Sequence, residues 1–222
     1  MAALTPMMQQ YMEVKNQYKD CILFYRLGDF YEMFFDDALT ASKVLEITLT
    51  GRDCGQPERA PMCGVPYHAC DVYLNKLIEN GFKVAICEQV EDPKLAKGIV
   101  KREVIRVVTP GTNMSNAILD ETRNNYLMSI FENDGAFGIS LVDITTGEFK
   151  TARVPSLSKL TDEINKYSPA EIIGNHSFMN CDLDFVYLRE KMKISISEAP
   201  EHYFNQMLCE DAIMRQFGVN NM

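Results

Sequence analysis

Residues 21–35, which read CILFYRLGDFYEMFF, constrain the fold more than any other stretch of this chain. Two apolar and aromatic runs, at 21–27 and 30–35, have the composition and length of β-strands that are buried in a sheet. One letter does not fit this description. Glu32 interrupts the second run, although burying an unpaired carboxylate costs several kcal/mol or forces it to take up a proton.

The geometry of a strand gives Glu32 a defined neighbour. Side chains two positions apart on a strand point to the same face of the sheet. We therefore expect Phe30 and Glu32 to project together, while Tyr31 and Met33 project to the opposite face and into the core. The pair would then be available for contact with something outside the core.

A plainer interpretation leaves the pair without a function. Phe30 would be an ordinary core residue, and Glu32 an edge carboxylate paired with Arg26 or Lys83. Spacing alone does not decide between the two interpretations.

Length and composition favour two domains, and the cysteine pattern favours reduced thiols. The 222 residues, 46% of them hydrophobic, suffice for two cores of ordinary size. No run of about 18 apolar residues occurs, and the N-terminus lacks a basic segment followed by an apolar one, so we expect neither a membrane span nor a secretory signal. Seven cysteines at irregular spacings fit free thiols better than a disulfide framework. We therefore expect a cytoplasmic protein.

The net charge of −9 argues against nucleic acid as a partner, because Lys and Arg normally supply most of the affinity for phosphate. The charge is uneven, however. Residues 1–110 hold 13 Lys and Arg against 15 Asp and Glu, whereas residues 111–222 hold 9 against 16. A basic strip at 94–106 contains Lys94, Lys97, Lys101, Arg102 and Arg106. The plainer interpretation of this strip is a solvated loop and strand face.

The first half of the chain has the pattern of a compact α/β unit. Thr5 and Pro6 predict a helix start. Helices are expected at 6–20, 36–45 and 71–79, and strands at 21–27, 30–35, 46–50, 62–67, 82–90 and 102–109, with a loop at 51–61. The segment 110–125 is rich in Pro, Gly, Ser and Asn, which indicates a linker between domains.

The second half begins with three strands at 126–133, 136–147 and 148–154, joined by tight turns, which predict an antiparallel meander. Helices at 156–167, 183–192 and 203–217 then alternate with strands at 170–174 and 193–197. A meander followed by alternating strands and helices is the order of a ribonuclease H-like α/β fold.

Two kinds of ligand site find little support. Neither phosphate-binding pattern, G-x-x-x-x-G-K-[ST] or G-x-G-x-x-G, occurs. Cys54, Cys63, His68 and Cys70 lie close in sequence but lack the paired spacing of a zinc site, so buried or loop thiols are the better interpretation. His176 and His202 are isolated from any candidate nucleophile.

Asp143 raises the possibility of a nuclease. It lies near the end of a strand in LVDITTGEF, where ribonuclease H-like nucleases place a metal-binding aspartate. Two-metal chemistry needs several converging carboxylates, and the later Glu171, Asp182 and Asp184 do not lie within apolar strands as such a site would require. A structural aspartate in a fold without catalytic function is the favoured interpretation, and a metal-dependent nuclease is the alternative.

The motifs TPMMQQYMEVK, FYRLGDFYEMFFDDA, APMCGVPYHA, VAICEQVEDP, REVIRVVTPGT and LVDITTGEF resemble, in order and spacing, the N-terminal part of the MutS family of DNA mismatch-recognition proteins. The resemblance covers essentially the whole chain. It implies a mixed-sheet α/β mismatch-binding domain at 1–112, a linker at 113–124, and a ribonuclease H-like connector domain at 125–222 that is truncated at its C-terminus.

The resemblance also implies residue roles. Phe30 and Glu32 match the element in which a phenyl ring enters the minor groove beside a mispaired base and a carboxylate hydrogen-bonds that base. The family's ATPase domain, which binds ATP and Mg, has no counterpart here, so no catalysis is expected of this chain. The family further implies a homodimer and a MutL-type partner for the connector.

Contacts to the DNA backbone are expected from charge and position at Arg52, Arg59, Pro66, His68, Lys97, Lys101 and Arg102. A further hypothesis is that the chain is only an interaction module, which binds the MutL-type partner through its acidic second half.

Overall fold

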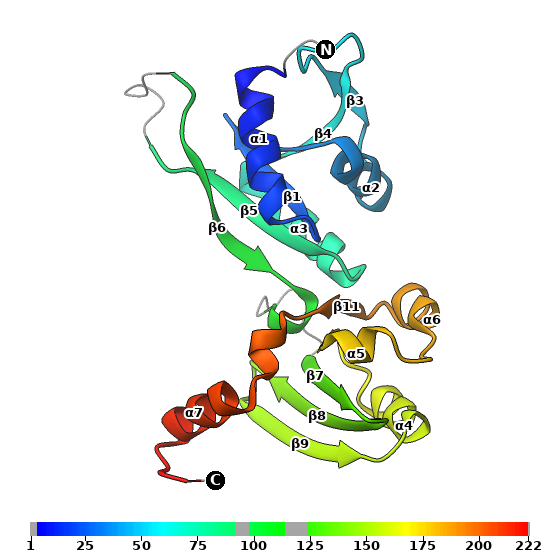
Figure 1. The fold of residues 1–222 in the computed structure, drawn as a ribbon. Helices are drawn as coiled ribbons and strands as arrows, with labels where there is room; N and C mark the ends of the chain where they lie inside the picture. The colour runs from blue at the N-terminus through cyan, green and yellow to red at the C-terminus, as the bar shows by residue number, and fades with distance from the viewer. Residues whose placement is uncertain (1–3, 92–97, 114–123, 222) are drawn as a thin grey trace. The chain divides into compact units, whose positions relative to one another are not determined.

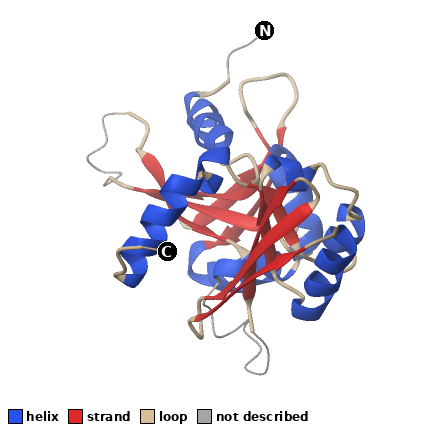
Figure 2. Ribbon diagram, turned by 60° about the horizontal axis from the view of Figure 1, so that its bottom comes forward, coloured by secondary structure: helices blue, strands red, loops and turns tan. Residues whose placement is uncertain are grey.

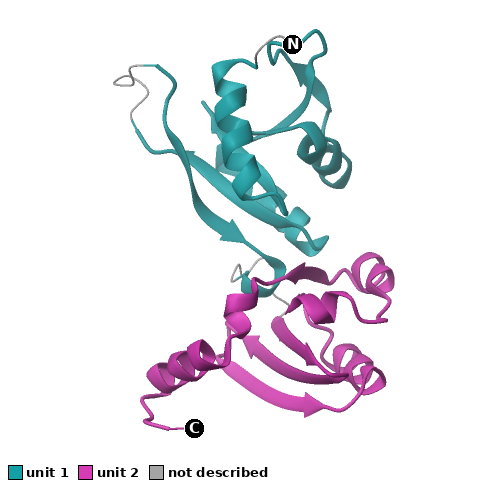
Figure 3. Ribbon diagram, viewed as in Figure 1, with its two compact units in different colours: residues 1–118 teal, residues 119–222 magenta. Residues whose placement is uncertain are grey.

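The computed structural model describes residues 4–91, 98–113 and 124–221. The chain divides into two compact units, residues 1–118 and residues 119–222 (Figure 3). This division falls inside the segment predicted to be a linker, of which residues 114–123 lie outside the described part. Each unit contains strands and flanking helices (Figure 2).

The first unit contains one mixed six-stranded sheet in the order β3-β4-β2-β1-β5-β6. Strands β1 and β5 pair in parallel, and the other neighbours pair antiparallel. The elements are α1 (Pro6–Gln17), β1 (Cys21–Leu27), β2 (Phe30–Phe34), α2 (Phe35–Leu45), β3 (Thr50–Arg52), β4 (Ala60–Pro66), η1 (Tyr67–Ala69), α3 (Cys70–Glu79), β5 (Lys83–Gln89), β6 (Arg102–Val108) and η2 (Pro110–Thr112).

Helices cover both faces of this sheet (Figure 1). One core contains residues of α2 and α3, packed against Phe24, Tyr31 and Met33 of the central strands. The opposite core contains Met8 and Tyr11 of α1, packed with strand residues that include Phe34. Strand β2 therefore lies in the interior of the sheet, and its alternate residues serve two different cores.

A buried carboxylate joins α1 and α2 to the central strand. Asp37, in the first turn of α2, accepts hydrogen bonds from the Lys15 ammonium at 2.8 Å and from the backbone N–H of Leu23 at 3.0 Å. Removing Lys15 would leave the buried Asp37 carboxylate without its counter-charge, which is strongly destabilising. The first unit thus holds α1 firmly on the face of the sheet that carries Phe34.

The second unit contains a five-stranded sheet in the order β11-β10-β7-β8-β9. Strands β7 (Tyr126–Asn133), β8 (Ala136–Asp143) and β9 (Glu148–Val154) form the predicted antiparallel meander, and β10 (Glu171–Gly174) and β11 (Ser195–Glu198) extend it in parallel. The helices are α4 (Leu157–Tyr167), α5 (His176–Met179), α6 (Phe185–Glu190), η3 (Glu201–Phe204) and α7 (Gln206–Phe217). This topology is the predicted ribonuclease H-like α/β arrangement.

The structure differs from the sequence prediction at several element bounds: the first helix ends at Gln17 and β8 ends at Asp143. The strand expected at 46–50 is displaced to Thr50–Arg52. Glu46 ends α2 in a left-handed conformation at φ 58°, and the chain returns to an extended conformation only after it, so strand pairing begins later. Helix α5 was not predicted, since its four residues are too few for a helical period to be visible. Its start is fixed instead by Asn175, whose side chain accepts from the N–H of Phe178 at 3.2 Å.

Candidate nucleic-acid interface

Phe30 is a large apolar side chain that the fold leaves in solvent. It is 46% exposed, whereas Tyr31 is 5% exposed and Met33 is fully buried. The predicted alternation of faces along β2 is therefore confirmed. At the other end of the same strand, Phe34 is buried with its ring centroid 4.9 Å from that of Tyr11 on α1. Helix α1 covers one end of this face, and Phe30 lies at the end that stays open.

The backbone around Phe30 is firmly held. Gly28 takes the positive φ of 58° that the tight β1–β2 connection requires. Phe30 then pairs with Leu27 on one side and with Pro66 of β4 on the other. The backbone N–H of Tyr67 donates to the carbonyl of Asp29 at 2.9 Å, so the GVPYHA segment is fastened beside the turn.

Tyr67, which directly follows β4, is a second exposed aromatic side chain, and it was not predicted from the sequence. The Arg26 guanidinium stacks over this ring, with its central carbon 3.7 Å from the centroid. Arg26 also pairs with Glu88 at 3.5 Å, and Glu88 accepts a hydrogen bond from the Tyr31 hydroxyl. Burial, followed by the nearby Glu88 carboxylate, raises the pKa of Tyr31 well above its ordinary value. The motif APMCGVPYHA, which contains Tyr67, was the sequence feature that could have pointed to this residue.

Glu32 has a partner that the sequence did not predict. Its carboxylate accepts a hydrogen bond from Nη1 of Arg52 on β3 and forms an ion pair with it. Arg26 pairs with Glu88, and Lys83 pairs with Asp20, so the expectation that either of them neutralises Glu32 was wrong. Glu32 is not an edge residue either, because β2 lies between β1 and β4.

Strand β4 lies between Glu32 and Arg52, and the register puts both side chains on the same face of the sheet. Gly64 of β4 lies directly opposite Glu32, and a Cβ at that position would approach the Glu32 Cγ to 3.4 Å. The Glu32 side chain is 15% exposed and that of Arg52 is 37% exposed. The ion pair is thus partly buried, and part of the Arg52 side chain remains accessible to solvent.

The other residues predicted to contact the DNA backbone differ in their exposure to solvent. Arg59 and His68 are exposed, and Pro66 is half-buried beside Phe30. Lys101 is exposed and forms a 2.5 Å ion pair with Glu103. Lys97 lies outside the described residues.

Arg102 is turned into the protein. Its Nε donates to the Arg26 carbonyl at 2.7 Å, and its Nη1 donates to Gln10 at 3.0 Å and to the Val100 carbonyl at 2.9 Å. The guanidinium also lies 5.1 Å from the ring centroid of Tyr25. These contacts join α1, β1 and β6, and a buried side chain cannot reach a phosphate. The prediction of a DNA contact at Arg102 is therefore corrected to a structural role.

Comparison with known families accounts for both units. Residues 5–117 match the family model described as MutS domain I. The chain belongs to the MutS family. Residues 125–220 match MutS domain II, so the second match covers the ribonuclease H-like unit.

Relatives named DNA mismatch repair protein MutS match along the chain. The one from Lachnoclostridium phytofermentans is 61% identical over 222 residues, which are 100% of this chain and 24% of the relative. The one from Acetivibrio thermocellus is 58% identical over 209 residues, which are 93% of this chain and 24% of the relative. The chain thus spans about a quarter of the length of these MutS proteins.

The four residues weighed as zinc ligands do not converge, in agreement with the preferred interpretation of buried or loop thiols. Cys54 belongs to the core beneath α1, and Cys63 belongs to the core beneath α2 and α3, on the opposite face of the sheet. All seven cysteines are free thiols. Among the described residues, no group of three or more His, Cys, Asp or Glu side chains is arranged to hold a metal ion.

Asp143, in MutS domain II, shapes a turn. It is fully buried, and its carboxylate accepts from the Thr145 N–H at 2.8 Å, the Thr145 hydroxyl at 2.6 Å and the Asn125 N–H at 3.1 Å. Burial acts to raise the pKa of this carboxyl, but the hydrogen bonds outweigh it and hold the pKa below its ordinary value. Because one oxygen serves the turn after β8 and the other holds the chain just before β7, the geometry favours the structural interpretation over a nuclease centre.

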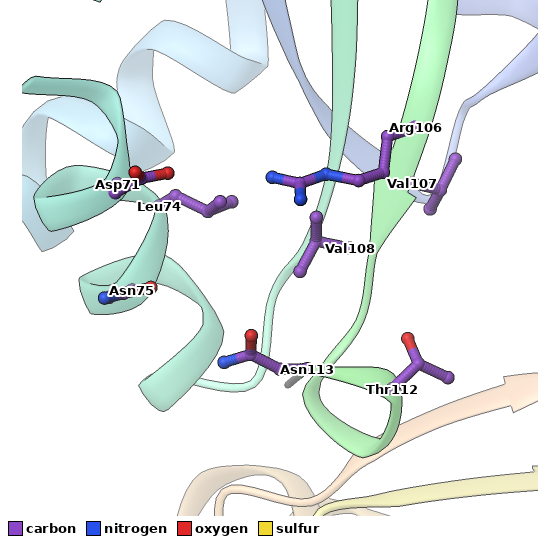
Figure 4. A pocket seen from close by; sticks show the side chains of 8 residues that line it. All are labelled: Asp71, Leu74, Asn75, Arg106, Val107, Val108, Thr112 and Asn113. Carbon is purple, nitrogen blue, oxygen red and sulfur yellow. The ribbon is translucent and has the colours of Figure 1, made fainter. Parts of the chain in front are cut away.

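A polar hollow of about 360 Å³ lies in MutS domain I between α3, β6 and η2 (Figure 4). Figure 4 shows the Arg106 side chain extending from β6 towards Asp71 on α3. Groups of both charges line this hollow. It therefore lacks the single positive sign that attracts a phosphate backbone, and it does not extend the candidate interface.

Proposed function

We propose that the first unit recognises mispaired or looped bases in duplex DNA, with Phe30 as a wedge in the minor groove and Glu32 as a hydrogen-bonding group for the mispaired base. The observation that carries the proposal is the exposure of Phe30 on a strand whose neighbours are buried. The relatives' shared name, DNA mismatch repair protein MutS, agrees with this function.

Insertion of the wedge is easier at a mispaired base step than at a correctly paired one. Inserting an apolar side chain unstacks a step at a cost of roughly a few kcal/mol. A mispair is already poorly stacked and bends easily, so this cost is lower there. Phe30 is supported on both sides by paired strands, and a rigid support means that the inserted ring need not be ordered on binding.

Glu32 contributes to discrimination because its charge is unfavourable near the phosphates of matched DNA. A carboxylate close to phosphates weakens binding to a duplex wherever its charge is not neutralised, and a displaced base that offers a hydrogen-bond donor supplies a partner that sound DNA does not. Discrimination would then combine an easier insertion at the mispair with a compensated charge. Exposed Arg59 and His68, with Pro66 beside Phe30, would position the backbone, and Lys97 and Lys101 stay predictions of the same kind.

The remaining partners also form part of the proposal. A MutL-type protein would contact the second unit, and the longer polypeptide would act as a homodimer. Because the sequence contains neither phosphate-binding glycine pattern, ATP and Mg would be bound by another domain and this chain would be non-catalytic. No helix among the described residues has the length and apolar character that crossing a bilayer requires, and a cytoplasmic location remains a prediction.

A duplex with 2-aminopurine beside a G·T mispair, compared with its matched counterpart, tests the function. We expect weak binding at physiological salt, with Kd no tighter than roughly 10⁻⁴ to 10⁻⁶ M, because a net charge of −9 repels phosphate. Affinity should fall as salt rises, and the fluorescence of the base analogue should change only on the mispaired duplex. Equal binding and equal fluorescence for both duplexes would refute the proposal.

A further inference from the structure

The ion pair between Glu32 and Arg52 determines whether phosphates meet the Glu32 charge. We infer that Arg52 is a specificity-determining residue that masks the Glu32 charge on matched DNA and releases it to a mispaired base. This inference rests on the proposed function, because it concerns the same carboxylate. It assigns to Arg52 a role different from that of an ordinary phosphate contact.

Burial explains why Glu32 must exchange one partner for another. The Glu32 side chain is 15% exposed, and a mostly buried carboxylate that loses its partner keeps the full penalty of desolvation. Glu32 therefore stays with Arg52 unless another donor replaces it. A sound base pair has its donors engaged in pairing and stacking, whereas a displaced base can offer one.

Arg52 is equipped to change partners. Its side chain is 37% exposed, and it lies on the same face of the sheet as Glu32, because their partners Ala60 and Gly64 on β4 are an even number of positions apart. A guanidinium carries five N–H donors, and the described pair uses Nη1. When Glu32 turns to a base, the guanidinium is free for a bidentate bond to a phosphate, which is among the strongest hydrogen bonds in proteins.

The consequence differs between the two duplexes. On matched DNA the pair stays closed, and phosphates approach a site with no net charge. Without Arg52 they would approach a bare carboxylate. On mispaired DNA the loss of Arg52 removes a phosphate contact but also removes the need to break the ion pair, so the two effects largely cancel.

The test compares Arg52→Gln with Arg59→Gln, a matched control for an exposed arginine nearby. Competition anisotropy would measure Kd for G·T and matched duplexes at several salt concentrations. We expect Arg52→Gln to weaken matched binding about five- to tenfold, as the Coulomb energy of one exposed charge near phosphate implies, and to change mispair binding by less than about threefold. Arg59→Gln should weaken both duplexes equally.

A double-mutant cycle with Glu32→Gln completes the test. In the Glu32→Gln background, Arg52→Gln should weaken both duplexes equally, because no carboxylate is left to mask. The inference is overturned if Arg52→Gln resembles Arg59→Gln, or if its selective effect persists without the Glu32 charge. Thermal melting must show that each variant is folded.

Failure of the proposed function would look different. Wild-type protein would then bind both duplexes alike, whatever residue occupies position 52. If wild type prefers the mispair and Phe30→Ala removes the preference, while both arginine variants behave alike, only the inference about Arg52 is wrong.

Discussion

Replacing Phe30 by alanine tests whether Phe30 is a wedge that inserts into DNA or an ordinary core residue. A buried aromatic side chain covers about 150–250 Å², and the 46% exposure of Phe30 leaves roughly half of that area out of water. At about 25 cal/mol per Å², about 100 Å² corresponds to some 2.5 kcal/mol. Alanine retains the Cβ part, so we expect Phe30→Ala to lower the free energy of unfolding by about 2 kcal/mol or less.

Phe34 provides the matched control, because it lies on the same strand and the same face but is 1% exposed. Truncating a buried phenylalanine costs about 3–5 kcal/mol. Urea unfolding should therefore show Phe34→Ala as clearly the less stable variant. DNA binding should rank the two variants in the opposite order.

The binding assay uses the same 2-aminopurine duplexes under conditions where both variants are folded. Phe30→Ala should lose its preference for the mispair and the change in base fluorescence, since no ring is left to stack. Phe34→Ala should retain both. The reasoning is refuted if Phe30→Ala costs as much stability as Phe34→Ala, or if it still discriminates between the duplexes.

Three further predictions concern single carboxylates and a buried arginine. Glu32→Ala should leave matched binding unchanged or stronger and weaken mispair binding modestly, because a repulsive charge and a hydrogen bond are lost together; weaker matched binding in titrations would contradict this. Arg102→Ala should lower the free energy of unfolding by about 1.5–3 kcal/mol, as expected for charge-assisted hydrogen bonds; unchanged urea stability with weaker DNA binding would return Arg102 to the interface. The lowered pKa of Asp143 means that its contribution to stability is complete above its ordinary pKa of 3.8 and is lost as pH falls through the folded value. Acid unfolding should therefore be less steep in Asp143→Asn, and an identical pH dependence would exclude this role.

Local patterns in the sequence were sufficient where a property depends on neighbouring residues. The alternation of Phe30, Tyr31, Glu32 and Met33 between two faces follows from the period of a strand, and the structure confirms it. The antiparallel meander of the second unit was equally visible, since its turns join consecutive strands. Short elements such as α5 were not visible, because four residues carry no period.

Only the tertiary structure decided which charges meet. Sequence proximity and charge offered Arg26 and Lys83 as partners for Glu32, but the order β3-β4-β2 brings in Arg52 on the same face. In the same way, Arg102 belonged to a basic strip by composition, yet the pairing of β6 with β5 turns it inward to the Arg26 carbonyl, 76 residues away. The spacing of residues along a strand specifies which of them share a face. The identity of an ion-pair partner depends on the order and register of strands, which are set by packing between segments that lie far apart in the chain.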